Sequence, residues 1–310
     1  MGEGVTLIRW VQTALMYGFL MLAYTSIKRL YSSAIAKITI IQLFIFNYLA
    51  EFSEQLLDTS WSIFFSITAI YFLIRWARNP STKFLLIGAT LLALACFVRT
   101  NYLPLILLSL GWVVYISRHH GQGPVLNSTL VAGICALPYM LIGLRNKLVS
   151  GDWVFLPTSG GYNFWLGNRE ISEGVNFFDG SQVTDLTDTP TAEAITYILN
   201  EPILFLARCW EKILFVLGYD NFDLELELGI FVPSLLAIIA LAIAKRTKVP
   251  IPEFIFIFLW ICCIIAPLIV IFPWGYGWRL QAGAMLLINF MASYSILAGY
   301  YLTRRVLQTY

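Results

Sequence analysis

Charge is scarce in this sequence. Lys, Arg, Asp and Glu together make up 12% of the 310 residues, whereas a soluble globular domain carries about twice that share. With 59% hydrophobic residues and a mean hydropathy of +0.75, the composition argues against a soluble globule and predicts a polytopic protein surrounded by membrane lipids. The net charge is only +2, and the basic residues are spread over many loops, so the sequence predicts no single basic patch that would bind nucleic acid.

Cysteine and histidine are also rare. The five cysteines lie mostly inside apolar runs and lack the spacing of metal ligands, so neither a disulfide framework nor a zinc site is indicated. The two histidines, His119 and His120, follow Arg118 in a basic turn, where we interpret them as a solvated flank. Repeats of fixed period, heptads and low-complexity segments are lacking as well.

Long apolar runs fill most of the chain. Several are shorter than the roughly 20 residues that cross a bilayer, but flanking aromatic and basic side chains can extend them. We therefore predict an all-α polytopic membrane protein with about nine transmembrane helices and one mixed extracytoplasmic loop domain. The runs are 10–27, 34–50, 59–74, 84–98, 102–116, 125–144, 228–244, 254–274 and 280–302.

Basic residues predict the topology, because the positive-inside rule places clusters of them in the cytoplasm. The clusters end every second run: Lys28-Arg29; Arg75, Arg78 and Lys83; Arg118; Lys245-Arg246-Lys248; and Arg304-Arg305. If these clusters are cytoplasmic, the runs cross a bacterial inner membrane with Met1 outside and the C-terminus in the cytoplasm. Every acidic residue except Glu253 is then outside. Because an exported N-terminus without a signal peptide precedes this first helix, we expect an upstream span to be missing.

The polar stretch 145–227 is longer than a simple connection and is rich in Gly, Asn, Asp and Thr. It divides the chain into transmembrane helices over 1–144, an extracytoplasmic domain over 145–227, and transmembrane helices over 228–310. Alternating residues and paired glycines predict short strands and turns over 151–168.

Pro202 interrupts a helical pattern near the end of this stretch. The pattern predicts two short helices between residues 191 and 217. We expect the second to lie along the membrane surface with Arg208, Glu211 and Lys212 toward water or headgroups.

Polar residues gather at the predicted outer boundary of the membrane. The segment 51–58 carries Glu51, Glu54 and Asp58, which together can bind a divalent cation or orient a sugar hydroxyl; the alternative is a solvated acidic turn. Arg99-Thr100-Asn101 separates two apolar runs, and its guanidinium can either receive a lipid phosphate or anchor the interface.

Two further sets lie on the same predicted face. Arg145-Asn146-Lys147 breaks the positive-inside pattern, and an anionic ligand at the outer surface is one reason for such an exception. Residues 274–279 include Trp274, Tyr276 and Arg279, which can form a sugar-stacking platform with a phosphate donor or an aromatic anchor.

Five degenerate motifs occur in a consistent order. They are Leu56-Leu57-Asp58 before a helix that ends in Arg75-Trp76; Phe97-Val98-Arg99-Thr100-Asn101; Arg145-Asn146 with Gly151-Asp152-Trp153-Val154-Phe155, Thr158 and Gly160-Gly161 through Gly167-Asn168; Tyr197-Ile198, Pro202 and Lys212; and Tyr276 through Arg279. In these motifs the sequence resembles the integral-membrane GT-C glycosyltransferases, specifically bacterial relatives of dolichyl-phosphate-mannose protein mannosyltransferases and of the aminoarabinose transferases of lipid A.

The resemblance implies transfer of a sugar from a polyprenyl-phosphate donor to a lipid, glycan or protein acceptor on the extracytoplasmic face. In that family the first helix precedes a large external loop with a catalytic acid. From the resemblance we expect this chain to begin after that loop, which agrees with an external Met1 and puts activity itself in question. The second acidic position of the family corresponds to Asp58.

Chemically, the acceptor hydroxyl must lose a proton while the departing phosphate gains charge. We expect Asp58 to orient the acceptor or a divalent metal, with Glu54 assisting, and Arg99 and Arg279 to hold the phosphate. Asn101, Arg145 and Tyr276 are further candidates for substrate binding. Asn163 and Asn168 either contact the sugar or stabilise turns.

Three other functions compete with this interpretation. A flippase or transporter for lipid-linked sugars should carry charges deep in its spans, whereas these charges cluster at span ends. A non-catalytic membrane subunit could receive the missing segment from a partner. An O-antigen ligase or polymerase would need more Arg and His in its large loop than residues 145–228 supply.

Overall fold

The computed structural model describes residues 3–45, 58–157, 159–168, 189–216, 236, 239, 251–270 and 277–307. Side chains are described for fewer residues: those at 3–5, 45, 159, 190, 214–216, 268, 277–283 and 301–307 are not described. Within these ranges the chain is helical, with no strand. The all-α prediction is therefore confirmed for the described residues.

The helices follow the predicted apolar runs closely. Eight of the nine runs coincide with a helix, and the ninth, 228–244, lies outside the described residues apart from 236 and 239. The helices of the bundle are α1 (Glu3–Leu30), α2 (Ser33–Ile45), α4 (Thr59–Arg78), α5 (Thr82–Val98), the short 3-10 helix η1 (Thr100–Tyr102), α6 (Pro104–His119), α7 (Pro124–Ser150), α13 (Ile251–Val270) and α14 (Gly277–Leu307).

Prolines begin several of these helices. Pro104 and Pro124 occupy the first turns of α6 and α7, where a residue without an N–H leaves no intrahelical hydrogen bond unmade. The prediction from Pro202 is confirmed as well: α9 (Pro190–Asn200) ends just before it and α10 (Pro202–Val216) begins with it.

Four of the described helices are long and apolar enough to cross a membrane by length and composition. These segments are Thr6–Leu30, Thr59–Arg78, Thr100–His119 and Pro124–Ser150, and four shorter apolar helices accompany them. Their burial differs strongly: 72% of the apolar window of α4 is buried, against 11% of that of α7. The helix α4 is therefore central in the bundle and α7 peripheral.

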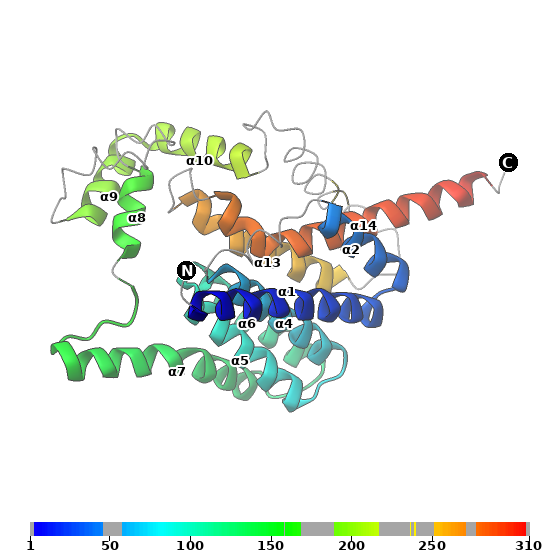
Figure 1. Ribbon diagram of the computed structural model, residues 1–310, viewed down its shortest axis with the longest axis horizontal. Helices are drawn as coiled ribbons and strands as arrows, with labels where there is room; N and C mark the ends of the chain where they lie inside the picture. Colours follow the sequence, from blue (N-terminus) through cyan, green and yellow to red (C-terminus); the bar gives the residue numbers. More distant parts are fainter. Residues whose placement is uncertain are drawn as a thin grey trace.

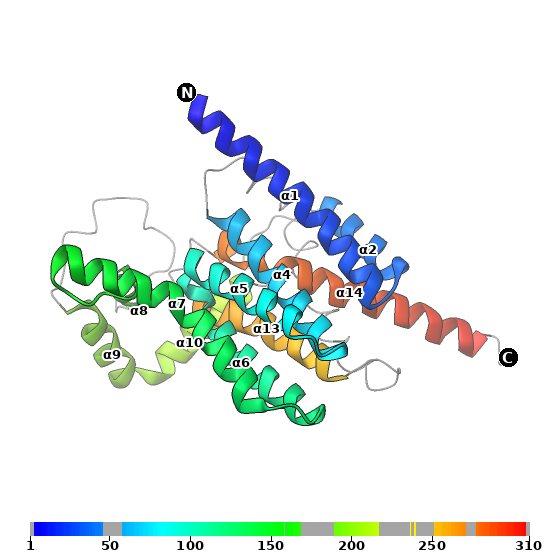
Figure 2. The ribbon, with the colours of Figure 1, turned by 90° about the horizontal axis from the view of Figure 1, so that it is seen from below.

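The bundle is organised around α4, which contacts α5, α1 and α14. Helices α1, α2 and α14 pack together, α6 and α7 pack on the far side beside α5, and α13 lies between α6 and α14. Figure 1 shows α8–α10 grouped on the same side of the molecule as the C-terminal end of α7, to which an extended loop joins them, and away from the C-terminus of α14. Figure 2 shows the N-terminal part of α1 projecting beyond the other helices.

The helix α8 (Ser159–Asn168) occupies the second part of the stretch 151–168, for which strands and turns were predicted, whereas residues 151–157 are non-helical. The prediction was wrong there because Tyr162, Trp165 and Leu166 lie at helical spacing and pack with Ala194 of α9. The paired glycines sit in the first turn. At Gly161 an added Cβ would lie 2.5 Å from Thr191 Oγ1, so glycine at this position permits the close approach of α9.

At the C-terminal end of α4, Arg78 forms an ion pair with Glu253 of α13. Arg78 Nε and Nη2 donate to Glu253 Oε1 and Oε2 over 2.7 and 2.6 Å, and Nη1 donates to the carbonyl of Leu30. The hydroxyl of Tyr31 donates to Glu253 Oε2 at 3.2 Å. These bonds tie the α1–α2 turn, α4 and α13 together through one carboxylate.

Replacing Glu253 by Gln should therefore destabilise the bundle. The amide leaves the guanidinium without its counter-charge, and since the Arg78 side chain is 32% exposed we expect a loss of about 1–3 kcal/mol. Unfolding in detergent micelles, followed by circular dichroism, measures the loss. Glu201→Gln, at an exposed position, is the matched control and should stay within about 0.5 kcal/mol of the parent; equal stabilities of the two variants would contradict the role of Glu253.

Candidate functional site

The candidate site lies at the other end of α4, where the chain enters that helix and leaves α5. Asp58 is the residue before α4, and Arg99 is the residue between α5 and η1, with extended backbone at φ −136° and ψ 106°. Because α4 and α5 are antiparallel neighbours joined by a short turn, the start of one and the end of the other meet. This topology brings together two residues 41 positions apart.

Asp58 and Arg99 form a bidentate pair. Arg99 Nε donates to Asp58 Oδ2 at 3.0 Å and Nη2 donates to Oδ1 at 3.1 Å, while Nη2 also donates to Thr59 Oγ1 at 2.8 Å. The Arg99 side chain is 5% exposed and that of Asp58 is 41% exposed. Planar paired bonds of this kind hold the carboxylate of Asp58 in one orientation, and the carboxylate remains partly exposed to solvent.

Two buried donors beside this pair lack an acceptor. Arg99 Nη1 and Asn101 Nδ2 have no hydrogen-bond partner. An unsatisfied buried donor costs about 1–3 kcal/mol, and more when it is charged, so an oxygen acceptor that reached these two groups would bind favourably. Donors of this type are suited to anionic or hydroxyl oxygens.

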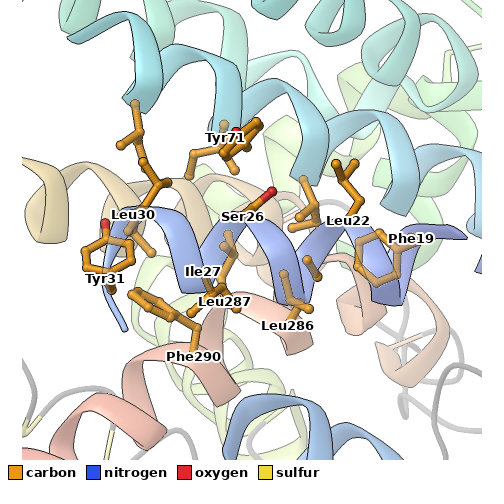
Figure 3. Close-up of a pocket in the computed structure, with 15 residues that line it drawn as sticks. Phe19, Leu22, Ser26, Ile27, Leu30, Tyr31, Tyr71, Leu286, Leu287 and Phe290 are labelled. Carbon is orange, nitrogen blue, oxygen red and sulfur yellow. The ribbon is translucent and has the colours of Figure 1, made fainter. Parts of the chain in front are cut away.

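Two apolar cavities among the described residues lie elsewhere. A cavity of about 50 Å³ between α1, α4 and α14 is lined by Phe19, Tyr31 and Phe290 among others, and Figure 3 shows its aliphatic and aromatic walls. A wider groove of about 430 Å³ runs between α6 and α13, over the stacked rings of Trp112 and Phe256. Neither includes a charged side chain, so neither supplies acid–base chemistry.

The other predicted site residues that the structure describes lie on η1, α7, α8 and α14. Arg145 is exposed on the last turns of α7, where Nη1 donates to Asn146 Oδ1 at 3.0 Å. Asn163 is half-buried within α8. Glu54 and Tyr276 lie outside the described residues, and Arg279 lies on α14 with an undescribed side chain.

Asn168 and Lys212 are structural in this arrangement. Buried Asn168 donates from Nδ2 to the carbonyls of Phe164 and Val270, which ties the end of α8 to the end of α13. Lys212 is 3% exposed and donates to the carbonyl of Gly167 at 2.8 Å. The expectation that Lys212 faces water or headgroups was therefore wrong: α10 turns that side inward, and the amine donates to a carbonyl at the end of α8 instead of to water.

Among the described side chains, no group of three or more His, Cys, Asp or Glu is placed to hold a metal ion. The acidic segment before Asp58 is outside those residues, so the expected divalent cation stays a prediction. Searches with protein-family models, among curated proteins and among solved structures find no match to this chain.

The buried amine of Lys212 generates a pH-dependent prediction. Burial lowers the pKa of Lys212 from 10.5 to about 8. Between these values the folded chain releases the proton that the unfolded chain retains, so the free energy of unfolding should rise with pH, on the order of 3 kcal/mol in total. Below pH 8 the penalty of the buried charge is fully present.

Lys212→Met is the matched variant, because it fills a similar volume without titrating. The difference in unfolding free energy between parent and variant should increase in the parent's favour from pH 8 to 10.5, measured by denaturant titration in micelles. A difference that is constant over this range would show that the amine is not held in a desolvated position.

Proposed function

We propose that this chain is a multi-pass membrane glycosyltransferase, or the membrane-embedded part of one. In this proposal it transfers a sugar from a polyprenyl-phosphate donor to a lipid, glycan or protein acceptor on the extracytoplasmic face. The observation that carries the proposal is the Asp58–Arg99 pair: a positioned, partly exposed carboxylate backed by a buried cation at the end of an apolar bundle.

The pair supplies the two charges that the reaction needs. The carboxylate of Asp58 orients or deprotonates the attacking hydroxyl. The cation of Arg99 offsets the charge that develops on the departing phosphate, and its free Nη1, with Asn101 Nδ2, offers donors for phosphate oxygens. The guanidinium also holds Asp58 in place, so Arg99 is in addition a positioning residue.

The placement of the remaining elements supports one reactive face. Asp58, Arg99, the end of α7 and the helices α8–α10 lie at one end of the bundle, whereas Arg78, Glu253 and His120 lie at the other. The predicted topology separates the same two sets by a membrane. Arg279 and Tyr276, predicted for the donor phosphate and sugar, belong by sequence to the first set.

A flippase or a non-catalytic subunit is the alternative. In the described apolar helices of the bundle the charged residues lie within the first or last two turns, with Arg9 of α1 as the most interior. This placement favours a site at the membrane rim over a charged path through the bilayer.

Proteoliposomes loaded with a polyprenyl-phosphate hexose and an acceptor lipid test the proposal. Arg99→Gln should lower transfer by roughly 100-fold, because a preorganised charge at the departing group is lost. Asp58→Asn should lower transfer as well, yet keep or tighten binding of the polyprenyl phosphate, because the amide accepts from only one of the two Arg99 donors and removes a negative charge beside the phosphate. Arg118→Gln, exposed at the opposite end, is the matched control.

Loss of transfer with binding kept or tightened in Asp58→Asn cannot arise from misfolding, which lowers both. Transfer and binding unchanged in Arg99→Gln would contradict the phosphate role. Binding without transfer in the parent chain would favour the flippase or subunit.

The topology has its own test. Asp152 and His119 are both exposed. His119 ends α6 just before α7 begins, and Asp152 follows the end of α7, so the two residues lie at opposite ends of α7. In a cysteine-free background, a membrane-impermeant maleimide should label Asp152→Cys in intact cells and His119→Cys after permeabilisation only. Labelling of both in intact cells would exclude a membrane between the two ends.

A further inference from the structure

The C-terminal end of α7 carries an unusual combination of exposed groups. Arg145 and Lys147 are both exposed, and they lie two residues apart, so they point to opposite sides of the helix. Between and beyond them Leu144, Leu148 and Val149 are exposed by 48%, 77% and 74%. Cations set among exposed aliphatic side chains are stable where headgroups meet hydrocarbon, and neither water nor a dry core suits both kinds of group.

The chain after α7 folds back along the helix and adds two aromatic rings. Gly151 closes the helix in the left-handed region at φ +84°, which allows the reversal. Asn146 Nδ2 then donates to the carbonyl of Val154 at 2.8 Å. Phe155 lies against Gly143, where an added Cβ would come within 2.4 Å of the ring.

The two rings form a fixed shelf. Trp153 and Phe155 are parallel within 8° at 5.6 Å between centroids, and Trp153 remains 53% exposed. Tryptophan favours the level of the lipid headgroups. The shelf is therefore positioned on the helix end beside Lys147, whose ammonium donates to the carbonyl of Gly151.

The length of the apolar run in α7 and the charge of the segment after it also place this helix end at the level of the lipid headgroups. The apolar run 125–144 spans about 30 Å as a helix, which equals the hydrocarbon core, so Arg145 is the first cation beyond it. Asp152 is the one acidic residue within 141–157, which leaves the segment with net positive charge. A basic helix end on the face opposite the cytoplasmic clusters requires a partner of opposite sign.

We propose that the end of α7, defined by Arg145, Lys147, Trp153 and Phe155, binds the headgroups of anionic phospholipids in the outer leaflet. The cations contact lipid phosphates on two sides of the helix, and the aromatic shelf packs against the glycerol and upper acyl region. The inference rests on the proposed membrane crossing and is independent of sugar transfer.

Photoreactive lipids test this surface in proteoliposomes of the full chain. A diazirine-bearing phosphatidylglycerol should crosslink to the peptide 141–157 more efficiently than the matching phosphatidylcholine, by about fivefold for each cation involved. In Arg145→Gln/Lys147→Gln the two probes should label this peptide equally. Gly143→Ala, which leaves the charge unchanged but displaces Phe155, should lower labelling by both probes.

The exposed turn around Arg118, at the other end of the bundle, is the internal control and should be labelled to the same extent in parent and variants. Equal labelling of 141–157 by the two probes in the parent would overturn the proposal, because the helix end would then be a simple interface anchor. Absence of labelling at both ends would instead overturn the membrane crossing. Neither result depends on whether transfer activity is found.

Discussion

Two arginine–carboxylate pairs, one at each end of α4, are the interactions on which the bundle depends. The helix has 20 residues and so measures about 30 Å, the thickness of a hydrocarbon core. Asp58 precedes it and is held by Arg99 of the α5–η1 junction, while Arg78 ends it and holds Glu253 of α13. Since isolated charges are expensive in an apolar interior, the partners of these pairs fix how α5 and α13 align with α4.

The two pairs are chemically alike but differ in access. At the Arg78 end the carboxylate is 7% exposed and also accepts from Tyr31, so its capacity is used within the fold. At the Arg99 end the exposure is reversed: the guanidinium is buried and the carboxylate is 41% exposed, with an unused Nη1 behind it. The same bidentate geometry thus uses the carboxylate fully within the fold at the Arg78 end of α4, and leaves the carboxylate partly exposed at the Arg99 end.

Much of this arrangement was predictable from sequence, because apolar length and charge position are local properties. The positions of the helices, the break at Pro202, and the grouping of Asp58 with Arg99 and Asn101 all follow from them. Partners distant in sequence were not predictable. Glu253 was identified as the one cytoplasmic acid, but its pairing with Arg78 across 175 residues depends on how α4 and α13 pack.

The two wrong predictions, for α8 and for Lys212, also concern residues whose structure depends on partners distant in sequence. The paired glycines of α8 suggested turns, and the helix forms because Trp165 and Leu166 find Ala194 of α9. Lys212 suggested a solvated face, and its burial depends on the carbonyl of Gly167, which comes close only after α8 has formed. In both cases tertiary contact outweighs local propensity, as expected for short helices whose stability comes from packing.

The helix α13 connects the two ends of the molecule. Its first turn carries Glu253, bound to Arg78, and its last residue, Val270, accepts from Asn168 of α8. It also contacts η1, the turn that follows Arg99. The helix α13 is bound to Arg78 at one end and to α8 at the other. A movement of α8–α10 relative to the Asp58–Arg99 pair would therefore have to break the Asn168 hydrogen bond or shift α13 away from Arg78. The α8–α10 group is therefore held in register with the candidate site by the same charge pairing that sets the bundle, and the site's geometry is a property of the whole fold.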